Sequence, residues 1–155
     1  METIARIDDY LAGPSLLRRA VAGMTQEQLA ARPIPGKWST LEVICHLADF
    51  EIVYADRIKR IIAENEPTIF SGDPTVFAAR LAYHQRNCEE ELLLITLIRQ
   101  HVARILRTLK PEDFQRRGIH SQSGPMTLDA MVERITGHIP HHLRFVEEKK
   151  KALEA

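Results

Sequence analysis

The sequence of 155 residues has no excess of charge of either sign, since 21 Lys and Arg residues balance 21 Asp and Glu residues. A neutral chain lacks the basic surface that non-specific binders of nucleic acid and anionic membranes use. No apolar run approaches the roughly 18 residues of a transmembrane helix, and no basic, apolar signal peptide is recognisable at the N-terminus. Two cysteines, Cys45 and Cys88, are too few for a disulfide framework, which favours a reducing compartment. We therefore expect a cytoplasmic protein that binds neither nucleic acid nor membrane.

Strand signals are also scarce, because alternating β-branched runs bounded by turns do not extend over any useful length. Helical periodicity dominates instead, in segments at about 3–24, 39–66, 81–109 and 127–153. A polar, glycine-containing stretch at 115–125 is interpreted as an irregular excursion or a short hairpin. These features predict an all-α fold, a four-helix bundle with long connections, in a single domain over residues 1–155.

Local signals set several helix ends. Ser39 and Glu42 have the spacing of a capping box, which predicts a helix start at this point. Asp73 followed by Pro74 has the form of an N-cap with proline in the first turn. The dipeptide Gly13–Pro14 predicts a break or kink within the first segment.

The clearest chemical signal is a pair of histidines on the last predicted helix. Seven histidines are present, and His138 and His142 are one helical turn apart. At 100° per residue both fall within or beside the apolar stripe, whereas His141 points towards solvent. Pro140 lies between the pair, where it either opens space for a ligand or simply bends the helix. Two inward imidazoles need polar partners, so they either bind a metal ion or donate to backbone carbonyls.

A metal site with an open position needs a third protein ligand. His46 lies beyond the edge of the apolar arc of its helix, where a surface position is expected. His84, on the inner face of the segment 81–109, and His120, in the polar excursion, are alternative ligands. The pattern alone leaves the choice among these three open.

Two stretches resemble a known family. The segments Gly36–Asp49 (GKWSTLEVICHLAD) and His138–Val146 (HIPHHLRFV) are similar to the two signatures of the DinB-like superfamily. The resemblance implies a four-helix bundle in which His46, His138 and His142 bind a divalent metal, with zinc or nickel as the leading identities. It also implies a homodimer, which would agree with the broad apolar arc that Leu47, Phe50 and Tyr54 give to the second helix.

The superfamily includes bacillithiol S-transferases and a mycothiol-dependent maleylpyruvate isomerase. The resemblance therefore implies that the metal activates a low-molecular-weight thiol for transfer to a small electrophile. A metal-dependent hydrolase and a non-catalytic, stress-related metal- or ligand-binding bundle are the alternatives. Asp49 and Glu42 could orient a ligand or act as a base, but we favour their interpretation as solvent-facing acids, with Glu42 in the cap. We expect Cys45 in the core and Trp38 across the mouth of the bundle.

Overall fold

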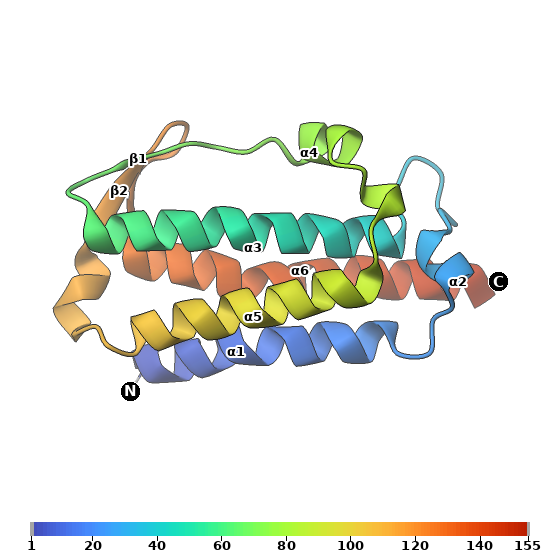
Figure 1. Ribbon diagram of the computed structural model, residues 1–155, viewed down its shortest axis with the longest axis horizontal. Coiled ribbons are helices and arrows are strands. Elements are labelled where there is room, and N and C mark those ends of the chain that lie inside the picture. Colours follow the sequence, from blue (N-terminus) through green and yellow to red (C-terminus); the bar gives the residue numbers. More distant parts are fainter. Residues whose placement is uncertain (1, 155) are drawn as a thin grey trace.

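The computed structural model describes residues 2–154, with side-chain environments from residue 5, and its architecture is a four-helix bundle (Figure 1). The long helices are α1 (Glu2–Val21), α3 (Thr40–Ala63), α5 (Cys88–Leu106) and α6 (Leu128–Glu154). The short elements are α2 (Gln26–Ala30), α4 (Pro74–Arg80), two 3-10 turns (Tyr83–Gln85 and Pro111–Gln115) and strands β1 (Thr68–Ile69), β2 (Arg117–His120) and β3 (Gly124–Thr127). The predicted all-α bundle is thus confirmed.

The order of the helices around the bundle differs from their order along the chain. α1 packs against α5 and α6, and α3 packs against the same two helices, so α1 and α3 are diagonal. Figure 1 shows that α3 and α5 run in one direction and that α1 and α6 run in the opposite direction. The connection between α3 and α5 therefore returns along the length of α3, which makes it long, as the sequence indicated.

The polar excursion before α6 forms a hairpin, one of the two forms expected for it. β2 pairs with β3 in antiparallel register, and β1, from the α3–α5 connection, adds to β2 in parallel. This small sheet lies at the end of the bundle where α3 ends and α6 begins (Figure 1). It ties the long connection to the last helix through backbone hydrogen bonds.

Two predicted caps are present, and two predicted boundaries are wrong. Ser39 and Glu42 form the reciprocal capping box at the start of α3, and Asp73 caps α4. The segment expected to be helical from residue 81 instead begins at Cys88, because the Asn87 side chain accepts the N–H groups of the first turn. Of the break or kink expected at Gly13–Pro14, the break does not occur, since α1 continues through it.

The helix continues through Pro14 because a buried arginine replaces the donor that proline lacks. Pro14 has no N–H for the carbonyl of Tyr10, and the Nη1 of Arg99 donates to that oxygen at 2.7 Å. Gly13 makes room for this contact, since a Cβ at that position would lie 2.1 Å from the same nitrogen. The Gly13–Pro14 pair therefore accommodates the side chain of Arg99 from α5.

Arg99 also joins the other two long helices. Its Nε donates to Oε1 of Glu51 on α3 at 2.7 Å, and its Nη2 donates to the carbonyl of Ile135 on α6 at 2.9 Å. The hydroxyl of Tyr10 donates to Oε2 of Glu51 at 3.3 Å. The side chains of Arg99 and Glu51 are both 0% exposed, so this ion pair is fully buried. It forms a polar layer between two apolar clusters of the core, one on the side of Ile7 and one on the side of Leu17.

The apolar arc of α3 does not form an external surface. Leu47 and Phe50, which were expected to widen an exposed stripe, are buried within this chain. That arc therefore gives no support to a homodimer, which stays a prediction. No helix among residues 2–154 is long and apolar enough to cross a membrane.

We predict that Arg99→Met lowers the free energy of unfolding by about 3–5 kcal/mol, because it leaves the Glu51 carboxylate buried without a counter-charge. The double variant Arg99→Met/Glu51→Leu should recover part of this loss but not all of it, since two backbone carbonyls stay unpaired. Urea unfolding in the presence of a chelator measures both effects without a contribution from metal.

The matched control is Arg107→Met. Arg107 directly follows the last residue of α5, is exposed and forms an ion pair with Asp8. Its effect should stay within about 0.5 kcal/mol. Equal stability losses for Arg99→Met and Arg107→Met would show that the buried layer does not hold the helices together.

Candidate metal centre

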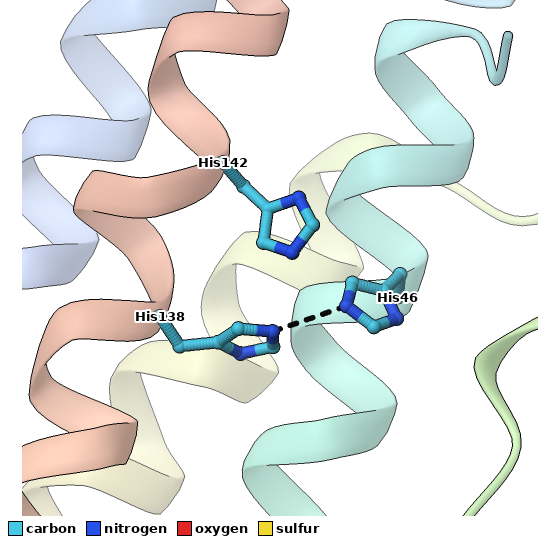
Figure 2. A group of neighbouring side chains, drawn as sticks. All are labelled: His46, His138 and His142. Atoms are coloured by element: carbon cyan, nitrogen blue, oxygen red, sulfur yellow. Dashed lines mark hydrogen bonds between the residues drawn. The ribbon is translucent and has the colours of Figure 1, made fainter.

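Three histidines from two helices converge between α3 and α6. His46 comes from α3, and His138 and His142 come from α6; one ring nitrogen of each lies within 4.8 Å of the others. The Nε2 atoms of His46 and His138 are 3.1 Å apart, and Figure 2 shows a ring nitrogen of His142 turned towards the same space. Two ligands at about 2.1 Å from a tetrahedral ion are about 3.4 Å apart. The nitrogen positions therefore fit a metal ion with small shifts of the rings.

The two histidines of α6 face inwards as their spacing predicted. The side chain of His141 is exposed, whereas His138 and His142 are half-buried and their ring centroids are 4.8 Å apart. α6 runs through Pro140 without interruption, and this proline is exposed. One helical turn thus presents two imidazoles to the same point.

The expected surface position of His46 is wrong. His46 is only 5% exposed, because the ring of Phe50 packs against it at 4.7 Å and the ring of Trp38 at 5.3 Å between centroids. Trp38 belongs to the loop before α3, and its predicted place near the site is confirmed. The helical wheel of α3 could not show the contacts that His46 makes with the loop before the helix and with His138 and His142 of α6.

The other two histidines considered as ligands lie elsewhere. His84 is exposed on the 3-10 turn before α5, which is not part of the helix predicted for it. His120 is in the hairpin, where its Nδ1 accepts the N–H groups of Gln122 and Ser123, both at 3.2 Å. Neither belongs to the histidine cluster.

Burial keeps the three imidazoles neutral. Desolvation lowers the pKa of His46 to about 4, and the nearby charge of Asp49 opposes this only in part. Desolvation, with repulsion from the other rings, lowers the pKa of His138 to about 3 and that of His142 to about 4. The Nδ1 atoms of His46 and His138 are buried without a hydrogen-bond partner among the described residues. Neutral imidazoles are the form that binds divalent metals.

The two acids considered near His46 are both engaged in ion pairs. Asp49 accepts hydrogen bonds from Nη1 of Arg86 at 2.9 and 3.0 Å. Glu42 accepts the N–H of Ser39 at 2.7 Å and a hydrogen bond from Nε of Arg32 at 3.0 Å, so it serves the cap. The ligand group contains no carboxylate, and neither acid is a free base beside it.

Cys45 lies next to His46 in the sequence but points into the core, as expected. It is fully buried, and burial raises the pKa of its thiol to about 12. A thiol with so high a pKa is protonated at neutral pH and is not a nucleophile. Cys45 therefore supplies neither a sulfur ligand nor a nucleophile to the centre.

Sequence reasoning missed the residues that hold the two ligand-bearing helices together. Glu51 follows His46 by five residues on α3, and Ile135 precedes His138 by three on α6. Arg99 bonds to both Glu51 and the carbonyl of Ile135, which fixes the helices close to the histidines. The sequence did contain one signal for this contact. Arg99 lies four residues after Ile95 and three before Val102, so helical spacing places it on the buried apolar stripe of α5.

Comparisons with known proteins agree with this geometry. A family model described as the DinB superfamily matches residues 10–146. A relative from Oceanobacillus iheyensis named "Putative metal-dependent hydrolase OB0782" is 31% identical over 145 residues, which are 94% of this chain and 82% of that protein. "Putative metal-dependent hydrolase YfiT" from Bacillus subtilis is 26% identical and covers 90% of this chain and 79% of its own.

A solved structure supports the fold. The structure of YfiT from Bacillus subtilis, described as "a probable metal-dependent hydrolase with an unusual four-helix bundle topology", superposes with a TM-score of 0.91 at 24% identity. The match covers 98% of this chain and 87% of that one. The diagonal placement of consecutive helices seen here is thus shared with a protein of known structure.

We predict that His142→Ala removes stoichiometric metal, because two remaining imidazoles hold an ion only weakly. Elemental analysis after gel filtration measures the metal content per chain. The matched control is the adjacent His141→Ala, which should keep the metal because His141 is exposed and outside the cluster. Loss of metal in His141→Ala with retention in His142→Ala would contradict the ligand set.

We also predict an unusual pH dependence of metal affinity. Below about pH 6.5, protons compete with the metal for histidines of ordinary pKa. Each such histidine can weaken metal binding by up to tenfold per pH unit. With pKa values of about 4, 3 and 4, the imidazoles here bind no competing proton until the pH falls much further. Affinity measured by chelator competition should stay nearly constant from about pH 7.5 to 5.5 and fall below about 4.5. A steep loss between pH 7 and 6 would show that the rings are solvated.

Proposed function

The chain belongs to the DinB superfamily, and we propose that it is a metal-dependent enzyme that activates a low-molecular-weight thiol for transfer to a small electrophile. His46, His138 and His142 are the proposed ligands of a divalent ion, and zinc or nickel suits this set of imidazole donors. The observation that carries the proposal is the convergence of three neutral imidazoles without any free carboxylate beside them.

A divalent ion bound by three imidazoles keeps a position open and lowers the pKa of a water or thiol in that position. The residues of this chain supply the setting for that chemistry. Trp38 and Phe50 pack against His46, which limits access of water to one side of the ligands. Arg86 and Arg32 form ion pairs with Asp49 and Glu42, so both acids beside His46 are already engaged.

The engagement of both acids beside His46 favours a thiol over water. Metal-dependent proteases with histidine ligands pair the ion with a glutamate that accepts the proton of the attacking water. A thiol needs no such base, because a thiol that coordinates a metal is deprotonated outright. Both acids near this site are already neutralised by arginine, which suits a nucleophile that loses its proton on binding.

Hydrolysis is the second candidate, and the names of the relatives favour it. The proteins from Oceanobacillus iheyensis and Bacillus subtilis are both named as putative metal-dependent hydrolases. Three neutral histidines and an open position are also a donor set that can generate a hydroxide nucleophile near neutral pH without a carboxylate. The two candidates share the ligands and differ in the molecule that occupies the open position.

The test uses zinc-loaded protein with cysteine, glutathione or 2-mercaptoethanol as the thiol and monobromobimane as the electrophile. In this reaction a C–S bond forms, a C–Br bond breaks, bromide leaves and the thiol proton passes to the buffer. We expect a metal-dependent rate that is nearly constant from about pH 6 to 8, because the bound thiol is already ionised. The uncatalysed rate should instead rise almost tenfold per pH unit below the thiol pKa of about 8.5.

His142→Ala should abolish the metal-dependent rate, and His141→Ala should retain it. Hydrolysis of p-nitrophenyl acetate by the same samples tests the second candidate. Ester hydrolysis that requires His142, without acceleration of any thiol, would replace thiol transfer with the hydrolase function. Stoichiometric metal without either reaction would leave the non-catalytic binding bundle.

A further inference from the structure

A cavity beside the histidine cluster joins cationic and apolar side chains. Its volume is about 240 Å³, and it is lined by His142 together with Trp38, Val43, Phe145, Lys37 and Lys149. The lining contains two lysines and no acidic residue. The cavity therefore runs from a proposed metal ligand to a cluster of positive charge, with apolar walls between them.

Lys149 is the unusual member of this lining. It is only 4% exposed, and its Nζ makes one hydrogen bond, 3.3 Å long, to the carbonyl of Phe145. Phe145 lies four residues earlier on α6, so the ammonium points back along the helix towards His142. An ammonium carries three donors, and a buried lysine is expected to be paired. Among the described residues Lys149 forms no ion pair.

The carboxylates in this region do not supply the missing partner. Two carboxylate charges act on Lys149. The stronger is that of the adjacent Glu148, whose exposed side chain forms no ion pair with Lys149 among the described residues, and the weaker is that of Glu42, which is held by Arg32 and by the N–H of Ser39. Glu147 bonds to Lys150 on the outer side of α6. The positive charge of Lys149 is thus left for a group that enters the cavity.

The loop before α3 brings a second ammonium to the same place. Gly36 has a φ of 74°, a left-handed conformation that favours glycine, and this turn is followed directly by Lys37 and Trp38. Burial lowers the pKa of Lys149, and repulsion from the charge of Lys37 lowers it further, against the attraction of Glu148 and Glu42. A bound anion would relieve this repulsion.

We propose that this cavity binds the anionic group, a carboxylate or a phosphate, of a small substrate whose apolar part lies against Trp38 and Phe145. Lys149 and Lys37 hold the anion, and the other end of the molecule reaches the metal position at His142. The inference specifies the substrate class for the proposed function and rests on it for the reacting end. The anion-binding part does not need the metal, so it can be tested separately.

The test uses metal-free protein and two matched probes, 3-phenylpropionate and its neutral amide, 3-phenylpropanamide. Trp38 is the only tryptophan of the chain and lines the cavity, so its fluorescence reports occupancy directly. We expect the carboxylate to bind at least about tenfold more tightly than the amide, as for a charge-assisted hydrogen bond in a desolvated site. Phenyl phosphate forms a third arm, and its affinity relative to the carboxylate decides which anion the cavity prefers.

Variants of Lys149 and Lys37 test whether their charges cause the preference for the carboxylate over the amide. Lys149→Met should remove most of the preference for the carboxylate over the amide, whereas Lys149→Arg should keep most of it. Lys37→Met should reduce the preference by a smaller factor, because Lys37 is exposed. The matched control is Lys151→Met, an exposed lysine of the same helix outside the cavity, which should bind as the unmodified protein does.

Equal binding of acid and amide by the unmodified protein would overturn the inference, as would failure of both probes to bind. An unchanged preference in Lys149→Met would also overturn it, and circular dichroism of Lys149→Arg and Lys149→Met verifies that both are folded. Because the metal is absent, a failure of thiol transfer or of metal binding in the earlier assays leaves this result intact. Conversely, metal-dependent thiol transfer with no preference for anionic probes would retain the proposed function and reject this cavity.

Discussion

The buried guanidinium of Arg99 is the interaction on which the arrangement of the bundle depends. From α5 it reaches the Glu51 carboxylate on α3, the Tyr10 carbonyl on α1 and the Ile135 carbonyl on α6, so it joins all four long helices. A buried charge is tolerated only when it is paired and its donors are satisfied. Any other order or relative shift of the helices would leave Arg99 or Glu51 buried without a partner.

The same constraint brings the metal centre into register. The polar layer contacts α3 five residues after His46 and α6 three residues before His138, so the layer and the histidines share the α3–α6 interface. A displacement by one helical turn, about 5.4 Å, would separate the imidazoles beyond the reach of one ion. The three histidines are therefore positioned by a polar layer that lies outside their cluster.

Around the histidine cluster the acids Asp49 and Glu42 form ion pairs, whereas the ammonium of Lys149 forms none among the described residues. Asp49 and Glu42 are held by Arg86 and Arg32, and burial keeps the three imidazoles neutral. Lys149 keeps its charge in the adjoining cavity without a carboxylate partner. A site that holds a cationic metal and a free ammonium has a net positive field, which attracts anionic ligands and stabilises a thiolate.

The sequence by itself determined what depends on neighbours within one or two helical turns. The Ser39 cap and the inward pair His138 and His142 follow from local spacing, and the start of α5 at Asn87 was a local signal that was overlooked. Only the tertiary structure decided that His46 is buried beside His138, which is 92 residues away in the chain. The same holds for the ion pair between Arg99 and Glu51, which are 48 residues apart. Periodicity predicts which side of a helix faces inwards. It does not predict which helix packs against that side, or how far the two helices are shifted along their axes. Packing sets both, since the four helices settle where the buried charges are paired.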